Sequence, residues 1–232
     1  MSRSLEELPL FPLDTVLFPY ASLQLHVFEE RYREMVRDCM EFDRRFGIVL
    51  IREEGKSGSL ANPYLVGTAV RIVQVHNYPD GRMDLHVQGE RRFRIRQMDE
   101  TGTYPVGLVE PVIEADSEDS ARAHALVTRA REDFQLLIQR LLSHPVINVQ
   151  VEFPPDAMAL SFTIANLLPM ENLEKQRLLE STDTLERLSE LLPILQHQIK
   201  EVDSSKVRFR VASQQRAWKL RLSDVEEWVN PN

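Results

Sequence analysis

The sequence has a single cysteine, Cys39, among its 232 residues. One cysteine cannot form an intrachain disulfide, and it excludes zinc sites built from paired cysteines. The chain also lacks an apolar run of about 20 residues, the length that a membrane-spanning helix needs. Its opening apolar stretch, LPLFPLDTVLFPY, is broken by prolines and preceded by Glu6 and Glu7, unlike a secretory signal. We therefore expect a protein of the reducing cytoplasm with no membrane partner.

Positive charge is also scarce. Lys and Arg number 28 against 36 Asp and Glu, which gives a net charge of −8. Contacts to phosphate groups rest on dense Lys and Arg, so this balance disfavours nucleic acid as a partner. The 43% of hydrophobic residues is ordinary for a globular protein with a substantial core.

A phosphate-binding loop is missing as well. The triplet GKS at residues 55–57 matches the end of such a loop, but the position of the required first glycine is Leu50. No helical pattern follows Ser57. The sequence therefore predicts no nucleotide cofactor.

The first half of the chain shows mainly strand patterns. We predict strands over residues 13–18, 23–28 and 46–51 from their apolar or alternating character. The apolar phase switches between Ile72 and Val73, which indicates a β-bulge or a strand buried on both faces. One early helix is predicted, and its apolar face comprises Phe28, Tyr32, Met35, Val36 and Cys39. Many short strands around one helix favour a partly closed barrel.

The triplet PDG at residues 79–81 predicts a tight turn between two strands. If Tyr78 pairs with Met83 across this turn, His76 and His86 project to opposite faces of the sheet. The two histidines then cannot share a metal ion, and the sequence predicts no metal site.

The second half of the chain shows helical spacing. Four helices are predicted, and the last begins at Asp183, where Asp183 and Glu186 form the pattern of a capping box. Pro193 lies inside this last helix and should kink it. We therefore expect an α+β protein with a β-barrel at 1–115, a helical bundle at 116–203 and a basic, aromatic tail at 204–232.

Four segments in this order resemble one known family. They are LPLFPLDTVLFP, LHVFEERYREM, VGTAVRIVQVHNYPDGRMDLHVQGERRFRI and TIANLLPMENLEKQRLLESTDTLERLSELLPIL. Together they are similar to the N-terminal substrate-binding domain of Lon proteases over residues 7–203. The resemblance implies a PUA-like barrel, a helical bundle, and the binding of unfolded or tagged protein clients.

Lon proteases continue into an ATPase domain and a Ser–Lys protease domain, and nothing in this sequence resembles either. We expect a stand-alone, non-enzymatic protein, and the sequence leaves open whether it serves a separate ATPase or protease. The alternative is a PUA-like module that binds RNA, since related barrels do so. RNA binding would weaken strongly with salt and need a basic groove.

Candidate contact residues are few. Tyr20 follows the first predicted strand, and Tyr78 and Met83 flank the hairpin tip, where large apolar residues are less expected. The charged row from Glu90 to Arg96 is interpreted as a solvated strand face.

The tail carries six basic residues and no acid between Lys206 and Arg221. Its apolar candidates for protein contact are Val207, Phe209, Trp218 and Trp228. The tail either folds back onto the protein's own sheet or docks on a partner, and its charge favours docking. A second copy of this acidic chain would then form a homodimer through exchanged tails.

Overall fold

The fold is taken from a computed structural model that describes residues 5–52, 63–115, 120–142, 154 and 156–204. The chain divides into two compact units. One contains the described parts of Met1–Ile113 together with Glu171–Glu180, and the other contains the described parts of the rest. The predicted barrel at 1–115 thus omits a later segment of the first unit, and the boundaries at residues 115 and 203 stay predictions.

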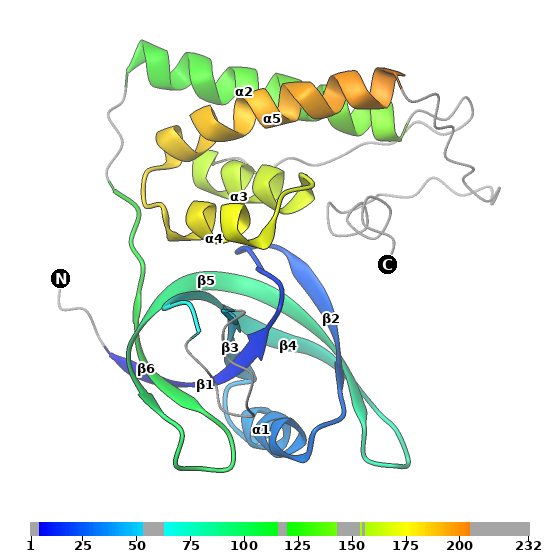
Figure 1. The fold of residues 1–232 in the computed structure, drawn as a ribbon, viewed down its shortest axis with the longest axis vertical. Helices are drawn as coiled ribbons and strands as arrows, with labels where there is room; N and C mark the ends of the chain where they lie inside the picture. Colours follow the sequence, from blue (N-terminus) through cyan, green and yellow to red (C-terminus); the bar gives the residue numbers. More distant parts are fainter. Residues whose placement is uncertain (1–4, 53–62, 116–119, 143–153, 155, 205–232) are drawn as a thin grey trace. The chain divides into compact units, whose positions relative to one another are not determined.

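The first unit is a six-stranded sheet with the strand order β2-β5-β4-β3-β1-β6. β5 also pairs with β6, so the sheet curves into a partly closed barrel while β2 extends from β5 alone (Figure 1). The strands are β1 (Glu6–Leu13), β2 (Ser22–Val27), β3 (Arg45–Leu50), β4 (Val66–Asn77), β5 (Met83–Asp99) and β6 (Val106–Pro111). The predicted α+β class and partly closed barrel are confirmed.

β1 ends at Leu13, so the predicted strand over residues 13–18 is wrong. β1 instead contains Pro9 and Pro12, which sheet interiors usually exclude. It pairs with β6 up to Pro9 and with β3 from Leu10 onward. The amide of Leu10 donates to the carbonyl of Pro105 beside β6, at 2.9 Å. Backbone nitrogens alternate in direction along a strand, so the nitrogen of Pro9 points toward β3, which pairs with β1 only from Leu10 onward. The nitrogen of Pro12 points toward β6, whose pairing with β1 ends at Pro9. Neither proline therefore removes a hydrogen bond from the sheet.

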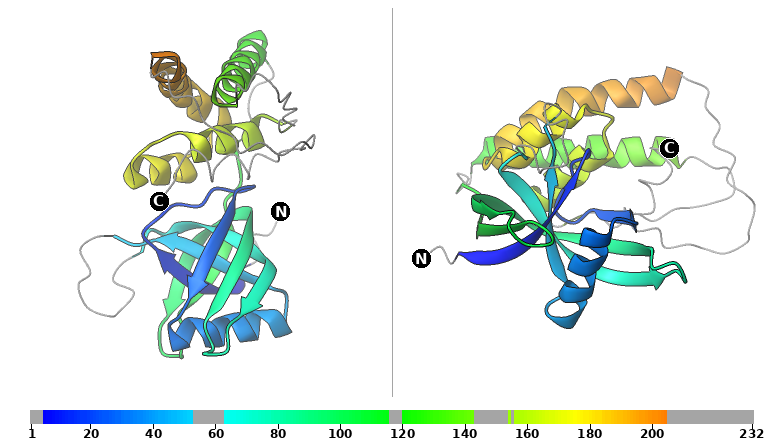
Figure 2. Two further views of the ribbon diagram at one scale, coloured as in Figure 1. Left: turned by 90° about the vertical axis from the view of Figure 1, so that its right-hand side faces the viewer. Right: turned by 60° about the horizontal axis from the view of Figure 1, so that its bottom comes forward.

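Helix α1 (Glu30–Glu41) runs across one end of the barrel (Figure 2). Its buried residues are Tyr32, Met35, Val36 and Cys39, as the spacing predicts. Phe28 was placed on the same apolar face, but it lies before the helix and is 62% exposed. Helical spacing alone does not show where a helix begins, and Phe28 belongs to the outward side of the preceding strand.

The hairpin between β4 and β5 differs from the prediction by one residue. Asn77 pairs with Met83, and the amide of Tyr78 donates to the carbonyl of Arg82 at 2.9 Å. Gly81 supplies the positive φ of +86° that the turn requires. The predicted bulge in β4 is confirmed, because the register shifts between Ile72 and Gln74.

Helix α4 (Asn172–Glu180) belongs to the first unit although it follows in sequence the helices of the second. The guanidinium of Arg92 donates from Nη1 to the carbonyl of Leu179 at 2.7 Å. The amide of Gln176 donates from Nε2 to the carbonyl of Val66 at 3.0 Å. These buried bonds hold α4 against β4 and β5.

The described part of the second unit contains three helices, α2 (Ala121–Leu141), α3 (Ala157–Leu167) and α5 (Thr184–Ser204). α2 and α5 lie side by side in every view (Figures 1 and 2). Asp183 caps α5, because its Oδ1 accepts hydrogen bonds from the amides of Leu185 at 2.8 Å and Glu186 at 3.0 Å. The predicted start of this helix is confirmed.

Candidate functional site

Tyr20, Tyr78 and Met83 are the predicted contact residues that the structure describes. Tyr78 is partly exposed at the start of the β4–β5 turn. Met83 is only 9% exposed and belongs to the buried core of the barrel, because it lies on the same face of β5 as Leu85 and Val87. Its burial leaves Met83 without the exposed surface that a client contact requires. The other candidates, Val207, Phe209, Trp218 and Trp228, lie outside the described residues and stay predictions.

Tyr20 lies at the opposite end of β2 from Tyr78. Its side chain is 45% exposed, and its backbone has the left-handed φ of 70°. The amide of Tyr20 donates to the carbonyl of Gly89 at 2.9 Å, and its carbonyl accepts from Nε2 of Gln88 at 2.6 Å. The structure therefore does not bring Tyr20 and Tyr78 together, since the intervening strand spans about 20 Å.

Five side chains meet on the outward side of β2 and the β4–β5 hairpin, and we call this surface the hairpin face. It comprises His26, Phe28, His76, Tyr78 and Asp84. The register places Asp84 between His26 on β2 and His76 on β4. The Asp84 carboxylate lies 2.6 Å from His26 Nδ1 and accepts a hydrogen bond from the Tyr78 hydroxyl at 2.5 Å. One carboxylate thus fixes side chains from two segments about 50 residues apart.

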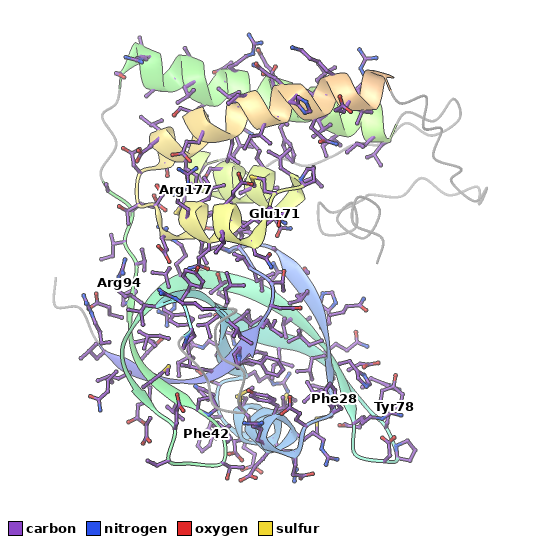
Figure 3. The ribbon with its side chains drawn as sticks, viewed as in Figure 1. Phe28, Phe42, Tyr78, Arg94, Glu171 and Arg177 are labelled. Atoms are coloured by element: carbon purple, nitrogen blue, oxygen red, sulfur yellow. The ribbon has the colours of Figure 1, made fainter. Side chains whose placement is uncertain are left out.

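Aromatic rings surround this carboxylate. The Tyr78 and His76 rings meet edge to face with centroids 4.8 Å apart, and the His26 ring lies 6.2 Å from Tyr78. His26 also stacks against Phe28 at 6.3 Å. Figure 3 shows Phe28 and Tyr78 on the same side of the barrel, beside the hairpin. The result is an exposed aromatic surface that rests on three hydrogen-bonded strands.

The charge at the centre of the hairpin face is maintained by hydrogen bonds. The pKa of Asp84 is lowered, chiefly by the hydrogen bond from Tyr78 and next by the one from His26. The same bond, together with desolvation, raises the pKa of Tyr78. Asp84 therefore stays ionised and Tyr78 stays protonated at neutral pH, which keeps their hydrogen bond in place.

The prediction that His76 and His86 project to opposite faces is wrong. His76 pairs with Asp84 and His86 pairs with Gln74, and positions 74 and 76 share one face of β4. Even so, the described ranges contain no group of three or more His, Cys, Asp or Glu side chains that could hold a metal ion.

The arginine row on β5 is only partly a solvated face. Arg92 is 4% exposed because it lies beneath α4, which corrects the prediction for that residue. Arg91 pairs with Glu6, and Arg96 pairs with Glu110 at 2.6 Å. Carboxylates of the same unit therefore neutralise much of this row, which does not favour a basic groove.

Phe28, His26 and Asp84 are not among the contact residues that the sequence predicts. A signal for two of them was present, because in LQLHVF the residues Gln24, His26 and Phe28 alternate with the buried ones. The helical spacing from Phe28 to Tyr32 obscured it. Asp84 had no local signal, since its role depends on the pairing of β5 with β2.

No helix in the described parts of the chain is both long enough and apolar enough to cross a membrane. Residues 7–197 match the family of the ATP-dependent protease La (LON) substrate-binding domain. It is 28% identical to the Lon protease of Escherichia coli K12 over 212 residues, which are 90% of this chain and 27% of that protein. It is also 28% identical to the Lon protease of Desulfovibrio desulfuricans, over 91% of this chain and 24% of that protein. The chain spans about a quarter of the length of these relatives.

Solved structures agree with this match. A Lon N-terminal domain protein from Xanthomonas campestris is 31% identical, with a TM-score of 0.59 over 81% of this chain and 98% of that one. The N-terminal domain of the Mycobacterium avium complex Lon protease shares the fold at 21% identity, with a TM-score of 0.62 over 82% of this chain and 98% of that one. The family match covers most of the sequence, from β1 into α5. The chain belongs to the Lon substrate-binding domain family.

Proposed function

We propose that this protein binds unfolded or tagged protein clients through the hairpin face. The family supports substrate recognition in general. The observation that carries the specific proposal is the 62% exposure of Phe28 beside a ring cluster held by Asp84.

Such a surface suits the capture of apolar segments. Aromatic side chains provide large contact areas, and they dominate binding energy at protein interfaces. Phe28 follows directly on β2, and Tyr78 is fixed by its hydrogen bond to Asp84. Because these side chains are already ordered, binding loses little conformational freedom.

Replacement of Phe28 by alanine tests this proposal. We expect Phe28→Ala to weaken binding of reduced, carboxymethylated α-lactalbumin roughly fivefold or more, as loss of a central aromatic contact does. Fluorescence anisotropy with the labelled unfolded protein measures the affinity. The matched control is Phe42→Ala, since Phe42 is 83% exposed but follows the far end of α1. An unchanged affinity in Phe28→Ala, or equal losses in both variants, would contradict the proposal.

We further propose that the chain itself has no ATPase or peptidase activity and passes clients to a separate ATPase or protease. The match to Lon is confined to the substrate-binding domain. We expect no ATP turnover and no cleavage of casein after rigorous repurification, and pull-downs with and without ATP would identify the partner. Strongly salt-dependent RNA binding in the same preparations would instead favour the nucleic-acid alternative.

A further inference from the structure

β2 is an edge strand. Within the described sheet it pairs with β5 alone, from Ser22 opposite Gln88 to Val27 opposite Met83. In an antiparallel pair each strand directs about half of its backbone amides and carbonyls toward its neighbour. The other half of the β2 groups therefore faces away from β5.

The same sheet has a second edge, in the far part of β4, and unlike β2 this edge is protected against further strand pairing. β3 pairs with β4 only between Thr68 and Arg71, so the far part of β4, Val73–Asn77, pairs with β5 alone. A bulge between Ile72 and Gln74 interrupts this second edge. Bulges, prolines and charged residues are the usual devices that prevent further strand pairing. β2 has the sequence SLQLHV and six consecutive pairs, and it carries none of these devices.

Exposed aromatic residues flank β2 at both ends. Tyr20 precedes it by two residues and is 45% exposed, and Phe28 follows it directly and is 62% exposed. The backbone bonds of Tyr20 to Gly89 and the stacking of His26 on Phe28 fix the two ends. A strand laid beside β2 would therefore run between two ordered aromatic side chains.

We propose that β2 binds an extended segment of a client as an additional strand of the sheet. This inference rests on the proposed function and specifies its mode: the backbone of the client is recognised along β2, and its apolar side chains contact Phe28 and Tyr20. Recognition through main-chain hydrogen bonds tolerates many sequences, because every residue except proline has the same donor and acceptor. Proline-free, extended apolar segments are the ligand class that this geometry selects.

A client segment fits this edge better than a second copy of the chain. Six residues of strand span about 20 Å, and with strands about 5 Å apart this edge covers only on the order of 100 Å², far less than the roughly 1,200 Å² that stable interfaces bury. The edge is also continuous with the hairpin face, since His26 lies within β2 and Phe28 directly follows it. A short, transient contact is what repeated capture and release of clients requires.

Amide hydrogen exchange in the unaltered protein tests the proposal. The probe is an octapeptide selected for binding from an array of overlapping α-lactalbumin peptides. We expect the peptide to slow exchange at alternate residues of β2, those whose amides face away from β5. β3, which pairs with strands on both sides, is the internal control and should not change. Protection at Val73–Asn77 instead, or no alternating protection in β2, would overturn the inference.

The peptide provides a second measurement. N-methylation removes one amide donor at a time, so we expect losses of about fivefold in affinity at every second position and little change between them. If every N-methylated peptide still bound and Phe28→Ala still abolished binding, strand addition would be overturned. Client binding by the hairpin face would remain supported. Binding insensitive to Phe28→Ala would instead contradict the proposed function. A dimer that persists when the peptide is added, with β2 already protected in the protein alone, would show that a second copy occupies β2 and would also overturn the inference.

Discussion

Cys39 illustrates how burial determines the chemistry of a single residue. Its side chain is 3% exposed, and its thiol donates to the carbonyl of Arg45 at 3.2 Å. Burial, and to a smaller extent the charges of Asp43 and Asp38, raise the pKa of this thiol from about 9 to about 12. The thiolate is the reactive form of cysteine. Cys39 is therefore a core residue in the folded protein.

We expect Cys39 to resist alkylation by iodoacetamide at pH 8 in the native protein and to react fully in urea. Because the folded pKa is raised, the protonated thiol stabilises the fold below pH 9, and this contribution falls as the pH rises from about 9 to about 12. Mass spectrometry of labelled samples measures the reaction, and Cys39→Ser provides the unlabelled control. Rapid labelling without urea would show that the α1 face opens readily.

At the scale of elements, α5 contains an unfavourable residue on its exposed side. Pro193 lies within α5 and is exposed. It has no amide hydrogen, so the helix lacks the usual bond from position 193 to the carbonyl of Ser189. The helix nevertheless continues from Thr184 to Ser204. Its capping at Asp183 and its packing with α2 outweigh the local cost.

Replacement of Pro193 by alanine should therefore stabilise the protein by about 1–3 kcal/mol, because it restores a helical amide and removes a steric conflict. Thermal unfolding followed by circular dichroism measures the change. Pro193→Gly restores the same amide but should gain about 1 kcal/mol less than alanine. A lower melting temperature in Pro193→Ala would mean that the ring itself stabilises α5.

Several elements could be predicted because a buried face imposes its period on the sequence. The stripe of α2 and the alternation in β5 are of this kind, with Phe134 and Phe93 both buried. The hairpin register could not be predicted, since loops of three and four residues both occur and the triplet PDG fits either. That single residue determines whether His76 lies beside Asp84. The hairpin face therefore depends on information that the local sequence does not contain.

At the scale of the whole molecule, the first unit is discontinuous in sequence. α4 is separated from the strands that it covers by the helices α2 and α3. Its Leu178 and Leu179 are buried, and Arg92 donates to the end of the helix. The barrel is complete only with residues from both halves of the chain.

A fragment of residues 1–115 should therefore be less stable than a fragment of residues 1–203. We expect a loss of roughly 3–5 kcal/mol from the uncovered leucine sites and the lost hydrogen bonds. Chemical denaturation measures the difference, and a synthetic peptide of residues 170–181 should raise the stability of the short fragment. Equal stability of the two fragments would show that α4 is dispensable for the barrel.

The late position of α4 also sets the timing of folding during synthesis. The first stretch of this unit ends at Ile113, but α4 begins only after the segment Glu114–Met170 has been made. A ribosome adds roughly 5–20 residues per second, so this segment takes about 3–11 s. For those seconds the nascent barrel carries an uncovered apolar surface where α4 will bind. A protein of the Lon substrate-binding domain family thus itself presents an apolar surface as it emerges from the ribosome.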